Sequence, residues 1–268
     1  MEKLIFNFKS SFSKTKVNPK YILGGKGANL AEMESGTEIE RTAAVKALVI
    51  QAQTDDKWAD PIITSFLRVL PDQLASPQEA IIDGLLELRK VKVSREEEIF
   101  ESIQETLDSP YPSVRSKVVD IWTRFSLKSD AKTSDTIAVL FEMLSDDDKD
   151  VRYQTQESLS KILHTVPKVA LPELKNAIGD DDWRVTYHSI VLLTEFAKKY
   201  PNPSAALAPE VIEAFNSGER LKERAADCIG MLGLANPEVV KPAVPGLIKG
   251  LESKSSELRK ACATALGR

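Results

Sequence analysis

The sequence has only two cysteines among its 268 residues, Cys228 and Cys262, and both lie in apolar runs with helical spacing. Such thiols are expected to be buried and reduced, and two of them cannot build the disulfide framework of a small secreted domain. The first residues contain no apolar run long enough for a signal peptide, and no stretch of about 18 apolar residues predicts a membrane span. We therefore expect a cytoplasmic protein that is neither exported nor inserted in a membrane.

Residues that carry chemistry are equally scarce. The two histidines, His164 and His188, stand in neither a His-Glu nor a His-x-x-x-His pattern, so the sequence predicts no metal site. No Gly-x-Ser-x-Gly segment, Cys-His arrangement or supported pair of carboxylates indicates a catalytic centre. We expect no cofactor and no catalytic residue, which favours a protein that is not an enzyme.

Neither sign of charge is in large excess. The chain has 36 Lys and Arg against 40 Asp and Glu, for a net charge of -4. This balance gives no overall attraction to the phosphates of nucleic acid or to anionic lipid, although it is compatible with a local basic patch. A protein partner is therefore expected before a nucleic acid or a membrane.

What the sequence does contain is a repeat with a period of about 37 residues. Large apolar residues close one type of predicted helix at regular intervals: Leu70, Leu107, Leu144, Ile178, Phe215 and Leu251. A second type of helix opens six or seven residues after each of them: Pro77, Val114, Val151, Val185, Leu221 and Leu258. Ile39 fits the second series one period earlier. This register predicts six complete helix pairs and an incomplete leading pair.

Each predicted helix buries only one side. The second helices carry a stripe at spacings of a helical face, for example Val151, Thr155, Leu159 and Ile162. Alternation of strand type is absent, and no Asn-Gly or Asp-Gly hairpin joins two such runs. Because one amphipathic pair cannot bury its own apolar face, whereas stacked pairs share a core, residues 34–268 are predicted to form an all-α fold, an α-solenoid of about six to seven two-helix repeats.

The residue pattern of these repeats resembles that of a known family of repeat proteins. The residues that carry the similarity in the last pair are Pro245, Leu247, Ile248, Leu251, Leu258, Arg259, Ala263, Leu266 and Gly267. With them, residues 239–267 and 144–163 resemble HEAT or HEAT-like repeats, and the resemblance covers roughly 230 residues. Departures from the pattern are Pro77-Gln78 in place of Val-Arg, Thr186 after Val185, and Gly218, which shortens one turn.

Residues 1–33 do not fit the repeat. The segment LGGKGANLAEM (23–33) and the lead-in MEKLIFNF resemble the start of the nucleotide-binding domain of pyruvate phosphate dikinase and phosphoenolpyruvate synthase. The rest of that domain, with its metal carboxylates and phosphohistidine carrier, has no counterpart downstream. We therefore expect this leader to act as a cap, with residues 28–33 as the first helix of the incomplete leading pair.

A phosphate contact in the leader is the alternative. Gly24, Gly25 and Gly27 would allow close approach of the backbone, and Lys26 would supply a cation before a helix N-terminus. The resemblance implies that Lys26 corresponds to a lysine near the nucleotide phosphates.

Two other recurring features are expected to be structural. The acidic clusters 146–148 and 180–182 stand before predicted helix N-termini, where carboxylates cap free N–H groups and oppose the helix dipole. A basic residue also follows the opening residue of several second helices: Arg115, Arg152, Lys222 and Arg259. A ladder that binds phosphate is one interpretation. We favour pairing with turn acids and carbonyls of the adjacent repeat, which is usual in HEAT arrays.

A binding surface is expected on the second helices, which usually line the concave face in HEAT-like arrays. At positions not used by the core stand Tyr153, Tyr187, His188 and Arg224. Tyrosine and arginine are enriched at binding hot spots because they combine a large contact area with directed polar groups. These four residues are the candidate partner-binding site, and ordinary exposed helix residues are the alternative interpretation.

The end of the sequence suggests a second contact. No polar helix follows the last repeat, so Leu258, Cys262 and Leu266 are expected to be partly uncovered. This predicts self-association through the C-terminal repeat.

These features favour a non-catalytic scaffold or adaptor that binds a protein partner. The alternative is an enzyme-associated HEAT-like protein, either similar to phycobilin lyases or a regulator of a dikinase-type phosphotransferase with a nucleotide contact in the leader. DNA glycosylases built on HEAT-like repeats would need a basic groove with tryptophan and a catalytic aspartate. The acidic balance and the scattered Trp58, Trp122 and Trp183 disfavour that class.

Overall fold

The computed structural model describes Met33 and residues 36–127 and 133–268. These residues form helices joined by turns, with no strand among them, which confirms the predicted all-α fold. The chain divides into two compact units, Met1–Val118 and Val119–Arg268.

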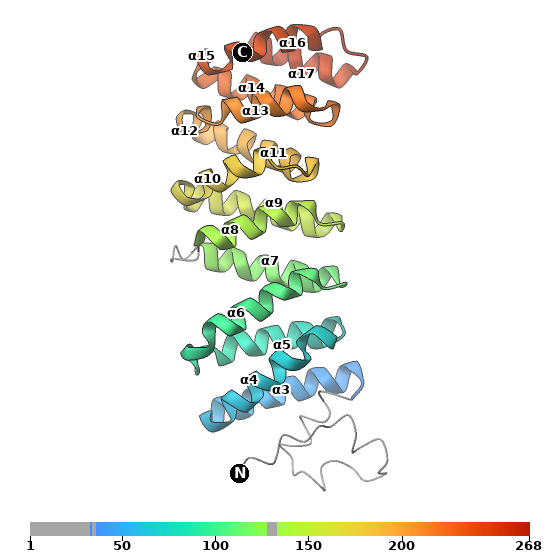
Figure 1. The fold of residues 1–268 in the computed structure, drawn as a ribbon, viewed down its shortest axis with the longest axis vertical. Helices are drawn as coiled ribbons and strands as arrows, with labels where there is room; N and C mark the ends of the chain where they lie inside the picture. The colour runs from blue at the N-terminus through green and yellow to red at the C-terminus, as the bar shows by residue number, and fades with distance from the viewer. Residues whose placement is uncertain (1–32, 34–35, 128–132) are drawn as a thin grey trace. The chain divides into compact units, whose positions relative to one another are not determined.

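The first unit contains the leading second helix and the helices that follow it (Figure 1). They are α3 (Glu38–Thr54), α4 (Ala59–Val69), α5 (Ala75–Leu88), α6 (Glu96–Glu105) and the start of α7 (Pro112–Ser126). Short 3-10 helices lie between them at η1 (Asp56–Trp58), η2 (Leu70–Asp72), η3 (Val93–Arg95) and η4 (Thr106–Asp108). The second helices α3 and α5 pack against each other, and α4 contacts both of them. This is the pairing that the repeat register predicts.

The second unit continues the same pattern. Its elements after α7 are α8 (Thr133–Glu142), η5 (Met143–Ser145), α9 (Lys149–Thr165), α10 (Pro167–Ile178), α11 (Trp183–Lys199), α12 (Pro201–Ala205), α13 (Ala208–Ser217), α14 (Glu219–Ala235), α15 (Pro237–Val240), η6 (Lys241–Ala243), α16 (Val244–Gly250) and α17 (Ser256–Gly267). The second helices α9, α11, α14 and α17 pack one after another as a layer, and the first helices α8, α10 and α13 form another (Figure 1). Two-helix repeats stacked in this way make an α-solenoid, as predicted.

The core is formed by the apolar helix faces that the sequence pattern predicts. Val151, Thr155, Leu159 and Ile162 of α9 expose none of their surface. Each buried aliphatic side chain of this kind stabilises the fold by about 1.5–3 kcal/mol relative to an exposed one. In the part of the chain that the structure describes, no helix is long and apolar enough to cross a bilayer.

The acidic clusters are helix caps, as predicted. The Oδ1 atom of Asp148 accepts hydrogen bonds from the backbone N–H groups of Asp150 (2.8 Å) and Val151 (3.2 Å) at the start of α9. Asp182 accepts from the N–H of Arg184 at 2.8 Å and caps α11 in the same way. A cap of this type stabilises a helix by about 1 kcal/mol.

Three recurring arginines bind carbonyl oxygens of their own repeat, whereas the sequence analysis expected acids and carbonyls of the adjacent repeat. Arg152 donates from Nη1 to the carbonyl oxygens of Asp146 and Asp147, in the turn just before its helix. The same bond to the carbonyl six residues earlier recurs from Arg115 to Ser109 (2.7 Å) and from Arg259 to Ser253 (2.7 Å). Because these guanidinium groups fold back over the helix N-terminus, they fix the turn within a pair.

The departures from the arginine pattern have their own contacts. Thr186 takes the arginine position in α11, and its hydroxyl donates to the carbonyl of Asp180 at 3.0 Å, again six residues earlier. Lys222 instead forms an ion pair with Glu219 on its own helix. An ion pair between successive repeats does occur at a different residue of α11. Arg184 contacts the carboxylate of Asp147, in the preceding repeat, at 3.1 Å.

Only one residue of the leader belongs to the described residues. Met33 is helical and fully buried. The candidate phosphate contact at Gly24, Gly25, Lys26 and Gly27 lies outside the described residues and stays a prediction, as does the expected boundary after Met33.

The C-terminal repeat differs from the expectation in part. Leu258 and Cys262 are buried, with 5% and 0% of their surface exposed, because α14 and α16 both pack against α17. The exposed apolar side chains of this repeat include Leu266 of α17 together with Val244, Ile248 and Leu251 at α16.

Candidate protein-binding surface

The second helices α9, α11 and α14 follow one another in the second unit, and the candidate residues are on their second turns. Tyr153 and Arg224 are exposed, whereas Tyr187 and His188 are half-buried. Since successive helices pack in register, residues one repeat apart on α11 and α14 face each other.

Tyr187 and Arg224 form the central contact. The Nε atom of Arg224 donates a hydrogen bond to the hydroxyl of Tyr187 at 3.0 Å, and the guanidinium carbon stands 5.7 Å from the centre of the tyrosine ring. The hydrogen bond that Arg224 donates to Tyr187 raises the pKa of Arg224 above its ordinary value. The two side chains therefore form a charged and aromatic unit that is ordered before any partner binds.

His188 is held beside this contact. Its ring lies 5.3 Å from that of Tyr187 in an edge-to-face arrangement, and its Nδ1 atom is hydrogen-bonded to Oε1 of Gln156 at 2.7 Å. Burial lowers the pKa of His188, and the charge of Arg152 lowers it further. At neutral pH the imidazole is therefore uncharged, and it links α9 to α11.

Tyr153 is at the edge of the group. It exposes 66% of its surface on α9. Among the described residues, no hydrogen bond or ring contact joins it to Tyr187, His188 or Arg224. The structure thus brings three of the four predicted residues together and leaves Tyr153 as a separate exposed ring.

Two residues that the sequence analysis did not select complete the surface. Arg220 places its guanidinium carbon 4.8 Å from the ring centre of Trp183, whose ring is in turn 6.5 Å from that of Tyr187. The sequence contains a signal for both residues, because the two pairs have the same spacing. Trp183 lies one helical turn before Tyr187, and Arg220 lies one helical turn before Arg224. We call these four residues, Trp183, Tyr187, Arg220 and Arg224, the cation-aromatic ladder.

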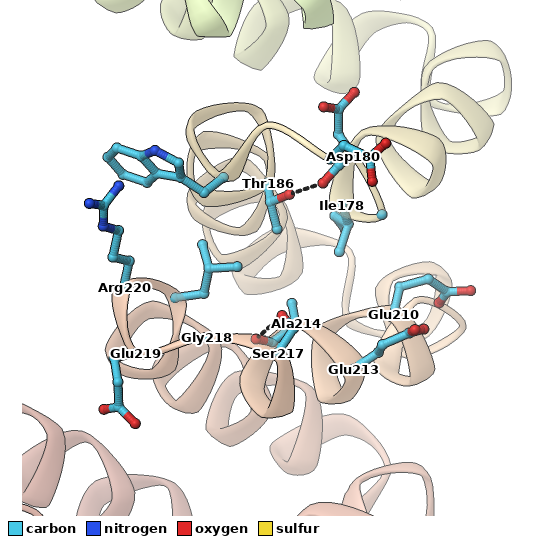
Figure 2. Close-up of a pocket in the computed structure, with 14 residues that line it drawn as sticks. Ile178, Asp180, Thr186, Glu210, Glu213, Ala214, Ser217, Gly218, Glu219 and Arg220 are labelled. Carbon is cyan, nitrogen blue, oxygen red and sulfur yellow. Dashed lines mark hydrogen bonds between the residues drawn. The ribbon is translucent and has the colours of Figure 1, made fainter.

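Beside the ladder, a cleft of about 660 Å³ opens between the α10–α11 turn and the α13–α14 segment. One face of α13 forms its floor with Glu210, Glu213, Ala214 and Ser217 (Figure 2). Asp180 lies on the opposite turn and Arg220 stands at one end (Figure 2), and Asp181 and Trp183 also line the cleft. We call this the acidic cleft, because five of its lining residues are acidic, Glu219 being the fifth, and Arg220 is its one basic lining residue.

The carboxylates of the cleft are spread over several elements. In the described ranges, no group of three or more His, Cys, Asp or Glu side chains is placed to hold a metal ion. The arrangement can instead accept hydrogen bonds from a cationic group that is larger than a metal ion.

The repeats match known sequence families. Residues 100–194 match the model of HEAT repeats, and residues 219–268 match that of a HEAT-like repeat. The chain contains HEAT repeats. Its solenoid fold is therefore a HEAT solenoid, and the predicted resemblance is confirmed for this part of the chain.

Solved structures of karyopherins share the fold. Kap121p superposes with a TM-score of 0.61 at 17% identity, and its complex with the extreme C-terminus of the protein phosphatase Cdc14p gives 0.62 at 16%. Kap95p in a complex with RanGDP gives 0.55 at 16%. The alignments cover about 90% of this chain for Kap121p and 89% for the other two structures, but only 29–34% of the karyopherin chains. At this identity the likeness shows the fold alone.

No curated protein matches the sequence. The matched families and structures do not support an enzyme-associated role, whether related to phycobilin lyases or to a dikinase.

Proposed function

We propose that this HEAT solenoid is a non-catalytic scaffold or adaptor, and that it binds a protein partner through the second-helix layer of its second unit. The observation that carries the proposal is the cation-aromatic ladder. Two arginines of α14 lie over two aromatic rings of α11 at 4.8 Å and 5.7 Å, and His188 contacts one of these rings.

The ladder has the properties of a binding hot spot. Trp, Tyr and Arg are the side chains that most often dominate binding energy at protein interfaces. Because Arg224 is already fixed by Tyr187, and Arg220 by Trp183, less side-chain entropy is lost when a partner docks.

The structural neighbours support a protein as the partner. Kap121p has been solved bound to the C-terminus of Cdc14p and to Pho4p, and Kap95p bound to RanGDP. These complexes show that HEAT-type solenoids of this fold hold other proteins. They do not identify the partner of this chain.

The test compares partner capture by the wild type and by a double variant, Tyr187→Ala with Arg224→Glu. Proteins retained from native lysate are identified, and the most abundant specific one is purified and titrated against both forms. We expect the double variant to bind at least tenfold more weakly, as expected for loss of a hot spot worth about 2 kcal/mol or more.

The control is Lys198→Glu, which reverses a charge on the exposed side of α11, away from the ladder, where Lys198 pairs only with Glu195. It should bind like the wild type. If the double variant also binds like the wild type, the ladder is not the binding site.

We further propose self-association through the C-terminal repeat. Ile248, Leu251 and Leu266 expose 54%, 39% and 36% of their surface. Sedimentation over a micromolar concentration series should show a dimer that is lost in Ile248→Glu. A monomer at every concentration in the wild type would retire this proposal.

A reducing compartment, the cytoplasm, is also proposed. Cys228 and Cys262 are both free and buried, and burial raises the pKa of Cys228 to about 12. A thiol in this state is unreactive and suits an environment in which no disulfide is needed.

The phosphate contact of the leader stays a separate proposal, based on the dikinase resemblance. Thermal unfolding with ATP, AMP and phosphoenolpyruvate should show stabilisation that disappears in Lys26→Ala. No shift with any of the three compounds would favour the cap.

A further inference from the structure

The acidic cleft is a second surface feature that the cation-aromatic ladder does not explain. We infer that it receives a lysine- or arginine-containing linear segment of the partner protein, whose cations pair with Asp181 and Glu213. For its partner the inference rests on the proposed function, but it can be tested without that partner.

The charge of the cleft selects a cation. Two of its acids already have lysine partners, Glu210 with Lys175 at 3.1 Å and Glu219 with Lys222. Asp180 uses Oδ1 to accept from the N–H of Asp182. Asp181 and Glu213, both exposed, remain at the cleft as acceptors from elements on its opposite sides.

Polar atoms of the cleft are short of donors as well. The Oε2 atom of Glu210 is shielded from solvent and has no hydrogen-bond partner, although its Oε1 atom pairs with Lys175. Guanidinium and ammonium groups carry several N–H donors each, so a basic segment can serve the carboxylates that are exposed at the cleft.

At the aromatic end of the cleft, Arg220 of the chain itself stacks over Trp183, and both residues line the cleft. The side chain of Arg220 is labelled there in Figure 2. Because 43% of the surface of Trp183 stays exposed beside Arg220, the stem of a partner's arginine or lysine can lie against the remaining indole surface while its head pairs with the exposed carboxylates.

The size and position favour a segment of a protein over a single ion. A space of about 660 Å³ lies within the range of ligand sites and exceeds what one metal ion requires. Trp183 and Arg220 belong to both the cleft and the ladder, so a partner docked on the ladder can continue into the cleft without a break.

The experiment measures fluorescence anisotropy of labelled nine-residue peptides with the full chain. The peptides share a Gly-Ser background and carry two arginines, two lysines, two glutamates or no charge. We expect binding of the basic peptides only, with an affinity that falls as salt is raised. In the double variant Asp181→Asn with Glu213→Gln, the affinity should fall about tenfold, as for a free-energy change of about 1.4 kcal/mol.

Two controls separate this inference from the proposed function. Glu157→Gln with Glu195→Gln removes two exposed acids outside the cleft and should not change peptide binding. Tyr187→Ala with Arg224→Glu should lose the partner but retain the basic peptides, because neither residue lines the cleft. Loss of the peptides in the cleft variant alone thus supports the cleft even if the ladder fails its own test.

Three results would overturn the inference. They are equal binding of neutral and basic peptides, unchanged affinity in a cleft variant whose melting temperature matches the wild type, and no saturation of any peptide up to about 1 mM, which corresponds to about -4 kcal/mol. Spermidine serves as a competitor, and if it binds more tightly than the peptides, the cleft is a site for small cations instead.

Discussion

The Nε atom of Arg224 on α14 donates to the hydroxyl of Tyr187 on α11 at 3.0 Å, across a sequence separation of 37 residues. This separation is the repeat period itself. A side-chain contact between successive repeats is therefore built from equivalent regions of two second helices, and it orders the surface that we propose binds the partner.

The variant Tyr187→Phe should separate the contribution of the hydrogen bond from that of the aromatic ring. The phenylalanine keeps the stacking surface at 5.7 Å from the guanidinium but removes the acceptor for Arg224. Because the pair is near the surface, we expect the free energy of unfolding to fall by no more than about 0.5–1 kcal/mol. The Nε–H signal of Arg224 should exchange faster with water in the variant when followed by NMR.

Tyr187→Ala is the matched comparison, since it removes the ring as well. It should weaken partner binding more than Tyr187→Phe does. Equal losses in the two variants would assign the effect to the hydroxyl alone, against a role for the ring.

The fold could be read from the sequence because it depends on local spacing. A stripe such as Val151 to Ile162 must be buried, and only stacked helices bury it in every repeat. The helix caps at Asp148 and Asp182 could also be predicted, because capping depends only on a carboxylate that directly precedes the helix in sequence.

The contacts between helices could be predicted only in part. The sequence analysis did not select Trp183, the first residue after the N-cap of α11. This position alone does not determine which side chain the indole ring contacts. The stacking of Arg220 on it depends on how α14 is rotated about its axis against α11. Leu258 and Cys262 were expected to be partly uncovered, because spacing along the chain does not determine that α14 and α16 both pack over α17.

Arg152→Ala should destabilise the second unit by about 1–2 kcal/mol, because the guanidinium donates to two turn carbonyls, those of Asp146 and Asp147. Arg152→Lys should restore only part of this, since an ammonium lacks the planar fork that reaches both oxygens. Chemical denaturation measures the difference. Lys149→Ala, an exposed neighbour on the same turn, should be within about 0.5 kcal/mol of the wild type.

Gly230 lies where two second helices, α14 and α17, approach each other closely. A Cβ atom at this position of α14 would stand 2.9 Å from the Cα atom of Ala265 on α17. Since that atom is backbone, the clash cannot be relieved by a rotamer change. Gly230→Ala should therefore cost about 1–3 kcal/mol in spite of the better helix propensity of alanine.

Gly267→Ala is the control for this prediction, because nothing lies within 4 Å of a Cβ added there. It should leave the melting temperature unchanged. A Gly230→Ala protein as stable as this control would show that α14 and α17 can separate without loss.

His188 should make stability depend on pH. Burial, with a smaller contribution from the charge of Arg152, holds its pKa below the ordinary value of 6.5. The unfolded chain therefore binds a proton at a higher pH than the folded one does. By linkage, folding stability is lost as pH falls through about 6.5 and continues to fall until the folded imidazole is also protonated.

His188→Gln tests this sign, because glutamine is neutral at every pH and can still hydrogen-bond to Gln156. Urea denaturation at pH 7.5 and at pH 5.5 gives the loss of stability on acidification for each protein. We expect a smaller loss in His188→Gln than in the wild type. An equal loss in the wild type and in His188→Gln would mean that His188 titrates alike in the folded and unfolded chains, and that Gln156 and Arg152 do not hold it in a neutral, shielded site.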